Sequence, residues 1–425
     1  MKLVIYGGTV IDPANDREAA LDVLIEDGLI RAVDKPGSFL TAGDTGIDAS
    51  GLVVAPGFVD MHVHLREPGF EYKETVLTGT QSAVAGGFTA VACMANTNPV
   101  NDNGSVTRYI IEKAQTANLA RVFPIGALSK GLKGESLADI GEMVAAGAVA
   151  ISDDGRPVMD GNLMRRALEY CSMFQLPISV HEEDLHLAAG GVMNEGPTSL
   201  RLGLKGIPNA AEDAMVARDI ILARLTGGRL HIAHTSTRGA VALVRQAKAE
   251  GLQVTAEAAP HHFILTEETV EGYNTNAKMA PPLRQMGDVL AIKEGLRDGT
   301  IDAIATDHAP HHRDEKEVEF DHAANGIVGL ETALPLTLRL VKEGVLSLSE
   351  AVRKLTFNPA RILGLPHGTL SVGAAADVVI FDPARSWQVV PEGLRSKSRN
   401  TPFGGWEMTG KAMTTLVGGK IVYTA

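Results

Sequence analysis

Histidine and aspartate residues recur in this sequence at the ends of short apolar runs. His62 and His64 end the first of these runs and are separated by one residue. In a strand, residues i and i+2 share a face, so both imidazoles could reach one metal ion. The same alternation predicts that Met61 and Val63 pack outward against helices. An H-x-H pair alone is weak evidence, because two ordinary hydrogen-bonded polar residues would give the same pattern.

Further metal-binding side chains follow four other runs. His181 and His234 each end a run, Asp307 ends the last one, and Asp153 and Asp154 end the fourth. A buried imidazole in a core would need its own partner, so a shared metal site explains the set better. Six ligands are too many for one four-coordinate zinc ion with an open position. They suit two ions bridged by a carboxylate and a hydroxide, and either aspartate of the pair could be the bridge.

Three more residues could bind or process a substrate at this site. Arg66 presents a planar guanidinium that suits a carboxylate, which predicts an anionic substrate. Asn96 follows the second run and could add an amide donor, and His311 would lie in the loop above the site. For Arg66 or Asn96 taken alone, a surface ion pair or a turn would be an equally good explanation. Asp307 could also take a proton from the water between the ions.

The elements that must position these side chains alternate in type. Eight apolar, strand-like runs are separated by amphipathic, helix-length segments such as 163–174 and 211–228. The runs span residues 53–64, 88–96, 121–128, 148–154, 177–182, 230–236, 253–262 and 301–308. This alternation predicts an α/β fold, a (β/α)8 TIM barrel, in which the carboxyl ends of the strands meet at one mouth. A doubly wound open sheet is the alternative, but the expected glycine-rich phosphate turn is missing from the sequence.

Both ends of the chain predict short β-strands instead. Runs such as 2–6, 376–383 and 413–417 are β-rich, and they are too short and too closely spaced for βα units. We therefore expect a small β-sandwich domain composed of residues 1–54 and 366–425. The barrel, residues 55–365, would interrupt it.

Composition limits the class of protein. The chain has 425 residues, a net charge of −12 and 45% hydrophobic residues, which is ordinary for a globular protein with a large core. The sequence lacks the stripe of basic residues that is typical of nucleic-acid-binding proteins, and it has no apolar stretch long enough for a membrane span. The two cysteines, Cys93 and Cys171, fall in a predicted strand and a predicted helix, so they are expected to be core residues and not nucleophiles. A cytoplasmic enzyme is expected.

Three segments carry a family resemblance. Residues 60–68 (DMHVHLREP) and 305–311 (ATDHAPH), the latter followed by Lys316, resemble the two dihydroorotase signatures, and 94–99 (MANTNP) resembles the family's second-strand segment. The chain thus resembles the dihydroorotases of the amidohydrolase superfamily, in their long bacterial form, over essentially all its residues. The fold implied is the barrel with its composite β domain.

The resemblance implies two zinc ions per subunit, bridged by Asp154 and a hydroxide. The metal ligands would be His62, His64, Asp154, His181, His234 and Asp307. Many relatives use a carbamylated lysine as the bridge, but no lysine occurs in 148–155. The family's spacing before His181 favours Asp154 over Asp153. Substrate contacts would come from His64, Arg66, Asn96, His311, Asn325 and Gly326.

The activity implied is the reversible hydrolysis of (S)-dihydroorotate to N-carbamoyl-L-aspartate, the third step of de novo pyrimidine biosynthesis. Metal-bound hydroxide would be the nucleophile and Asp307 the general acid/base. One alternative is another cyclic amidohydrolase, such as an allantoinase or dihydropyrimidinase. Another is a non-catalytic homologue that partners aspartate carbamoyltransferase. A homodimer is expected, with association to that transferase left open.

Two positions depart from the family pattern. Ala280 stands where relatives usually carry Asn, which removes an amide that would contact substrate. Asn325 replaces a usual Phe before Gly326, which alters the packing of that loop. Neither residue is a metal ligand. The charged run 313–319 is expected to be exposed, because burying that many charges would be costly.

Overall fold

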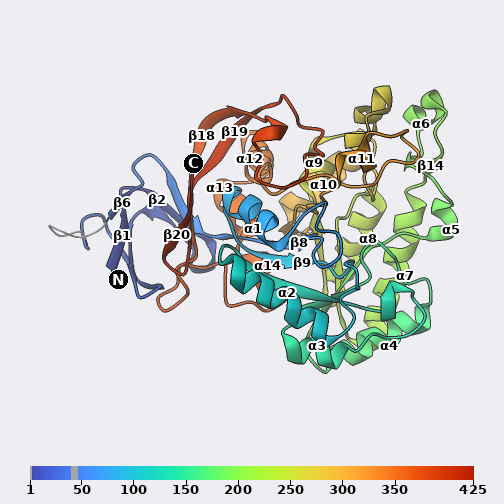
Figure 1. The fold of residues 1–425 in the computed structure, drawn as a ribbon, viewed down its shortest axis with the longest axis horizontal. Coiled ribbons are helices and arrows are strands. Elements are labelled where there is room, and N and C mark those ends of the chain that lie inside the picture. The colour runs from blue at the N-terminus through green and yellow to red at the C-terminus, as the bar shows by residue number, and fades with distance from the viewer. Residues whose placement is uncertain (1, 40–45) are drawn as a thin grey trace.

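The predicted barrel is the largest sheet of the molecule. The structure is a computed structural model that describes residues 2–39 and 46–425. Eight strands lie in chain order with parallel pairing between neighbours (Figure 1). They are β8 (Phe58–Val63), β9 (Phe88–Cys93), β10 (Arg121–Ala127), β11 (Ala150–Ser152), β12 (Pro177–Val180), β15 (Arg229–Ile232), β16 (Val254–Ala258) and β17 (Ala303–Ile304). A parallel bridge between Val63 and His308 joins the first strand to the chain just beyond the last and closes the barrel.

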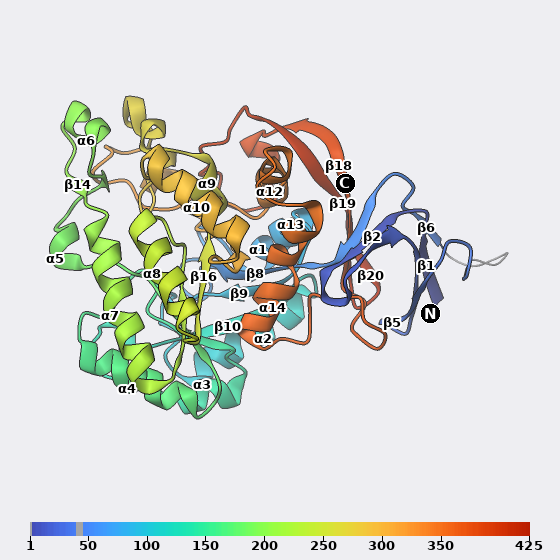
Figure 2. The same ribbon diagram turned by 180° about the vertical axis from the view of Figure 1, so that it is seen from behind.

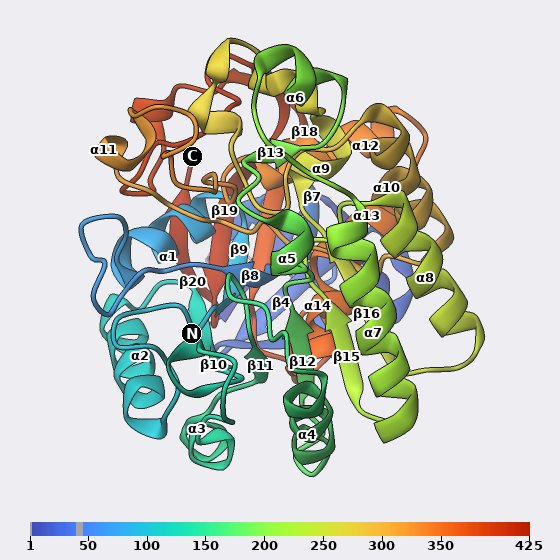
Figure 3. The ribbon, with the colours of Figure 1, turned by 90° about the vertical axis from the view of Figure 1, so that its right-hand side faces the viewer.

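Helices surround the strands, as Figure 3 shows in a view along the barrel. They are α1 (Val76–Ala85), α2 (Gly104–Ala117), α3 (Ile140–Ala146), α4 (Gly161–Ser172), α7 (Ala210–Thr226), α8 (Arg238–Ala249), α10 (Met286–Asp298), α12 (Ala333–Lys342), α13 (Leu348–Leu355) and α14 (Phe357–Leu363). In α4 the residues Leu163, Ala167 and Cys171 recur every four positions and are buried, while Asp160 caps its first turn. No helix within the described ranges is long and apolar enough to cross a membrane.

Shorter elements lie in the connections. Four are short helices: α5 (Leu185–Ala188), α6 (Pro197–Leu202), α9 (Pro260–Ile264) and α11 (Arg313–Lys316). Two short strands pair with each other, β13 (Met193–Asn194) and β14 (Gly206–Ile207). The 3-10 segments are η1 (Pro13–Asn15), η2 (Lys130–Leu132), η3 (Glu267–Tyr273), η4 (Thr275–Ala277) and η5 (Pro391–Gly393), of which η3 is longer and kinked at Glu271 and Gly272.

The two ends of the chain form one β-sandwich, as predicted, and both termini lie in it (Figure 2). One sheet has the order β5-β4-β1-β6 and the other β20-β19-β18-β7-β2-β3. The strands are β1 (Lys2–Tyr6), β2 (Thr9–Asp12), β3 (Arg17–Ala20), β4 (Asp22–Glu26), β5 (Leu29–Asp34), β6 (Gly46–Asp48), β7 (Val53–Pro56), β18 (Val378–Gln388), β19 (Glu407–Val417) and β20 (Lys420–Thr424). Ile5, Val23, Val54 and Ile380 share the core between the sheets. The domain limits, 54/55 and 365/366, stay a prediction.

One expectation about β8 is wrong. Val63 packs outward with Val76 and Ala83 of α1, as expected, but Met61 belongs to a cluster with Ala92 of β9 and Ile125 of β10. The pairing of β8 with β9 shifts register between Asp60 and Val63, so strict alternation fails there. An irregularity of this kind re-aims side chains next to a functional site.

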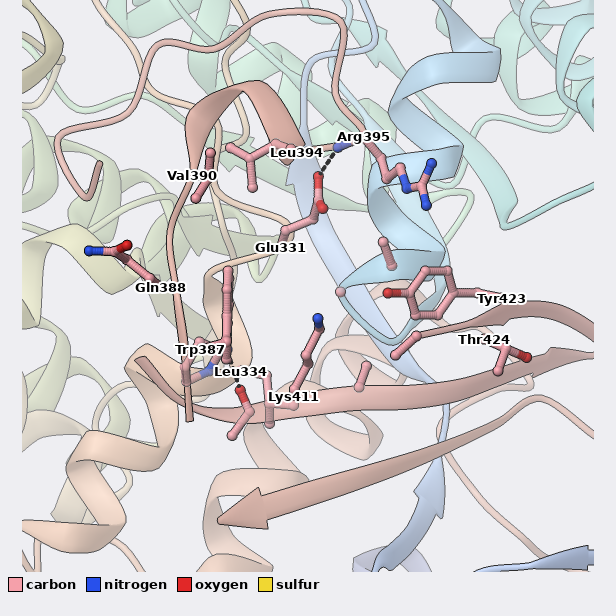
Figure 4. A pocket seen from close by; sticks show the side chains of 17 residues that line it. Glu331, Leu334, Trp387, Gln388, Val390, Leu394, Arg395, Lys411, Tyr423 and Thr424 are labelled. Carbon is pink, nitrogen blue, oxygen red and sulfur yellow. Dashed lines mark hydrogen bonds between the residues drawn. The ribbon is translucent and has the colours of Figure 1, made fainter. Parts of the chain in front are cut away.

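A cavity of about 290 Å³ lies where α1, α12 and the β18–β19 ribbon meet (Figure 4). Glu331 lies on its wall, where its carboxylate accepts hydrogen bonds from Ser82 Oγ at 3.0 Å and from the Arg395 backbone N–H at 2.7 Å. The lining contains none of the residues that the sequence singled out. Those residues gather instead at the barrel mouth.

Candidate metal centre

Six side chains converge at the carboxyl ends of five barrel strands, where His62 lies within β8 and the other five follow their strands. His62, His64 and Asp154 form one group whose ligand atoms lie within 4.8 Å of one another, and Asp154, His181 and His234 form a second. Asp154 belongs to both groups. Its Oδ1 is 3.3 Å from His62 Nε2 and 3.4 Å from His234 Nε2, while its Oδ2 is 3.5 Å from His64 Nε2. One carboxylate therefore stands between two sets of imidazoles.

Asp307 completes the first group. Its Oδ1 lies 3.1 Å from His64 Nε2 and 3.6 Å from His62 Nε2. The backbone of Asp307 is in the left-handed region, with φ of 46°, and His234 has φ of 31°. Non-glycine residues rarely adopt this conformation, and such strain tends to be held at functional sites.

The histidines are oriented by partners behind them. His62 Nδ1 is 2.6 Å from Glu257 Oε1 on β16, and His64 Nδ1 is 2.8 Å from Asn96 Oδ1. A partner on one ring nitrogen leaves the other free to face an ion. His62 Nε2 is fully buried and has no hydrogen-bond partner within the described part of the chain. An orphaned buried nitrogen aimed at carboxylates fits a metal ligand.

Electrostatics also favour positive charge at this point. Burial lowers the pKa of His181, but the carboxylates of Asp154 and Glu183 outweigh burial and raise it to about 10. Burial raises the pKa of Asp154, yet the surrounding histidines, His62 first, bring it well below its usual value. A site that stabilises protonated imidazoles and an ionised carboxylate in this way also suits bound cations. The donor set therefore fits a metal centre.

Asp153, the other carboxylate of the pair, plays a different part. Its Oδ1 accepts the backbone N–H of His181 at 2.9 Å, and its Oδ2 accepts that of Val158 at 2.8 Å. Both oxygens are thus used to hold backbone. Asp153 supports the strand ends, while Asp154 faces the histidines.

A cavity of about 270 Å³ opens above the histidines. Its lining includes every residue predicted to contact substrate, namely His64, Arg66, Asn96, His311, Asn325 and Gly326. Ala280 lines it too, so both departures from the family pattern face the pocket.

Arg66 and His311 lie side by side in the lining of this pocket, and Arg66 carries the positive charge. Arg66 Nε donates to Pro310 O at 3.1 Å, and its Nη2 lies 3.2 Å from His311 Nε2. Burial, followed by the neighbouring charge of Arg66, lowers the pKa of His311 to about 2, so its ring is neutral and accepts from the guanidinium. Arg66 has φ of 61°, and β8 ends at Val63, so a turn and not strand alternation brings its side chain to the mouth.

Comparisons with known proteins decide the family. The Dihydro-orotase-like family model matches residues 51–240, and the Amidohydrolase family model matches 224–423. A dihydroorotase of Syntrophotalea carbinolica is 59% identical, with 100% of this chain and 99% of the relative covered. A dihydroorotase of Geobacter metallireducens is 57% identical, with 100% of both covered. The chain belongs to the dihydroorotase family.

Solved structures of more distant proteins have the same fold as this dihydroorotase-family chain. A solved L-hydantoinase (dihydropyrimidinase) from Arthrobacter aurescens superposes with a TM-score of 0.89 at 27% identity, covering 99% of this chain and 96% of that one. The family places the chain among the amidohydrolases, enzymes that hydrolyse cyclic amides.

Sequence reasoning missed three residues around this dihydroorotase-family site, and it named a fourth, Lys316, only as part of a signature and without a role. The four are Glu183, which lines the pocket, Glu257 behind His62, and Lys316 and Asn400, which bond the pocket walls. Lys316 is buried, although the charged run around it was expected to be exposed and mostly is. Only Glu257 carried a usable signal, a lone carboxylate in an apolar strand. Glu183 lies 3.6 Å from His181 Nε2, whereas Lys316 and Asn400 act through hydrogen bonds to the backbone of other segments.

Proposed function

We propose that this enzyme catalyses the reversible hydrolysis of (S)-dihydroorotate to N-carbamoyl-L-aspartate. The observation that carries the proposal is one small cavity that has a cluster of metal-ligand type at its base and Arg66 on its wall. A cyclic amide that carries a carboxylate matches both features. The full-length relatives named dihydroorotase support the same reaction.

We further propose that the site holds two zinc ions. His62, His64 and Asp307 would hold one ion, His181 and His234 the other, and Asp154 would bridge them. Imidazole and carboxylate ligands suit zinc. When bound, the ions would supply a nucleophile from water at neutral pH and polarise the ring carbonyl.

The protein's own residues then move the protons and hold the ring. Asp307 would take a proton as the water oxygen bonds to the amide carbonyl carbon. It would return that proton to the ring nitrogen as the carbon–nitrogen bond breaks and the ring opens. Arg66 would bind the free carboxylate as a planar fork, with Asn96, His311, Asn325 and Gly326 around the ring.

Two other functions fit this chain less well. Because the fold resembles that of a hydantoinase, the first alternative is the activity of a different cyclic amidohydrolase, such as a dihydropyrimidinase or allantoinase. Arg66 and the absence of lysine from 148–155 argue against it. A non-catalytic homologue would have lost donors, whereas all six are present and converge here.

We also propose a homodimer that works in the cytoplasm, with the domain limits given above. Both cysteines are free and buried, which suits a reducing compartment. Association with aspartate carbamoyltransferase is a separate proposal, tested by co-elution of the two purified proteins.

The test combines metal analysis with substrate assays. We expect about two zinc ions per chain and turnover of dihydroorotate in both directions. Dihydrouracil, hydantoin and allantoin should be poor substrates, because none carries the carboxylate. A preference for one of these neutral rings, or metal-loaded protein without dihydroorotate turnover, would overturn the proposal.

A further inference from the structure

A segment from the C-terminal part of the chain supports one wall of the substrate pocket from behind, through hydrogen bonds to residues that line it. Residues 396–400, which we name the strap, follow η5 and precede β19. Ser396 Oγ hydrogen-bonds Glu74, and Ser398 Oγ donates to Lys73 O at 2.7 Å. The strap is therefore fastened to the loop that leads into α1, beside the barrel mouth. Nothing in the sequence assigned it a role.

At the end of the strap, the side chain of Asn400 reaches the pocket wall. Its Oδ1 accepts the backbone N–H of His311 at 3.0 Å, and its Nδ2 donates to Ala309 O at 3.0 Å and to Gly326 O at 2.9 Å. One partner is an N–H and two are carbonyls, so these contacts define the orientation of the amide. The side chain is 4% exposed, and all three partners line the cavity.

These bonds join two segments that face the substrate. His311 holds Arg66 through the 3.2 Å contact between their side chains, so the position of the guanidinium depends on that of His311. Gly326 has φ of 130°, and a Cβ there would lie 2.6 Å from that of Ala309, so the two segments pack closely. Asn400 bridges them by hydrogen bonds to both.

Lys316 reinforces the same junction from the other side. Its buried ammonium donates to Ala324 O at 2.7 Å, to Gly326 O at 3.2 Å and to Lys278 O at 3.3 Å. The Gly326 carbonyl thus accepts from both Lys316 and Asn400. Both donors bond backbone and leave the metal ligands untouched.

We propose that Asn400 is a positioning residue for the substrate carboxylate. It holds 309–311 and 324–326 together, so that Arg66 and His311 stand where the carboxylate arrives. The inference rests on the proposed function, because it names that reaction's substrate. Since Asn400 does not contact the metal donors, its loss should weaken substrate binding far more than it slows the chemical step.

Kinetics of the metal-loaded enzyme test this role. Asn400→Ala leaves buried backbone groups unpaired, and we expect KM for dihydroorotate to rise about tenfold while kcat changes less than about threefold. Metal content should not change. Thr401→Ala is the matched control and should behave as wild type, because within the described residues its hydroxyl accepts a hydrogen bond from Phe403 N of the neighbouring turn and from no other group. An unchanged KM in Asn400→Ala, or a loss confined to kcat, would overturn the proposal.

Hydrogen exchange provides a readout that does not depend on activity. In Asn400→Ala, peptides covering 309–313 and 324–328 should both exchange faster than in wild type. Asn400→Asp keeps the acceptor but loses both donors, so His311 should stay protected while 324–328 loosens. Unchanged exchange in these peptides, or faster exchange throughout the barrel, contradicts a local positioning role. If wild-type enzyme does not hydrolyse dihydroorotate, the proposed function fails, while these exchange patterns still report whether Asn400 joins the segments.

Discussion

At the scale of single residues, the site divides its work between groups that hold metal and groups that hold substrate. Asp154 stands between two imidazole groups, whereas its neighbour Asp153 bonds backbone. Adjacent residues of the same type thus have different roles because successive side chains point in different directions. Asp307 is the residue we assign to both tasks, as a metal ligand and as the proton carrier.

Replacing Asp307 separates these two tasks. We expect Asp307→Asn to lose at least about a thousandfold in kcat, because an amide cannot carry the proton. The five remaining donors should retain most of the metal. Steady-state kinetics with metal analysis by mass spectrometry checks both expectations. Near-normal turnover in this variant would refute the role given to Asp307.

Arg66 should act on binding rather than on chemistry. Arg66→Met keeps much of the side-chain volume but removes the fork, so we expect KM for dihydroorotate to rise by about ten- to a hundredfold. Metal content should be as in wild type. Arg313→Met, an exposed arginine on α11 that pairs with Glu317, is the control. An unchanged KM in the Arg66 variant would count against carboxylate recognition.

At the scale of elements, a buried arginine holds the loops beside the site. Arg284 donates to Ser236 Oγ at 3.0 Å, to Asn194 Oδ1 at 3.0 Å and to Ile207 O at 3.1 Å, and it pairs with Glu212 at 3.3 Å. Both members of the ion pair are 3% exposed. One side chain therefore links β13, β14, α7 and the segment after β15.

Removing Arg284 should be costly. Arg284→Met leaves the Glu212 carboxylate buried without its cation, and we expect a loss of about 3–5 kcal/mol in the free energy of unfolding. Arg245→Met breaks an exposed pair with Asp298 and should cost less than about 1 kcal/mol. Denaturant unfolding of both variants makes the comparison. Equal losses would show that burial of the pair does not matter.

At the scale of the whole molecule, Asp377 links the barrel to the sandwich. It precedes β18 and accepts from Arg121 of β10 at 2.7 Å and from the backbone of Gly418 at 2.8 Å. Burial opposes its ionisation, but His367 and Arg121 outweigh burial and lower the pKa of Asp377 to about 2. The ionised form is therefore the one that holds the two domains together.

This linkage predicts an acid-dependent loss of stability. The folded pKa lies below the ordinary value of 3.8, so the contribution is complete above about pH 4 and is lost as pH falls toward 2. We expect Asp377→Asn to remove about 2 kcal/mol at neutral pH and to flatten the stability profile in that window. Asp16→Asn, in an exposed pair with Arg353, should leave the profile unchanged. Unfolding measured between pH 2 and 7 decides between these outcomes.

The local sequence pattern was sufficient to predict much of the fold and of the candidate site of this protein. Eight apolar runs alternating with amphipathic segments predicted the barrel, and β-rich ends predicted the composite sandwich, because period and spacing are properties of neighbouring residues. The strand-end histidines and aspartates could be picked out for the same reason, since parallel strands bring their carboxyl ends to one mouth. Met61 shows the limit of this reasoning, because a register shift in β8 cannot be seen in an alternating pattern.

Contacts between segments that are distant in sequence could not be predicted from the sequence. Asn400 and Lys316 lie 74 and 10 residues from Gly326, yet both bond its carbonyl. The sequence places donors near a strand end, but their distances and the partners behind them depend on how separate elements pack. Types and spacing were enough to indicate the chemistry. Only folding brought together Asp154 with four histidines, and the strap with the pocket wall, because such contacts join residues that no local period relates.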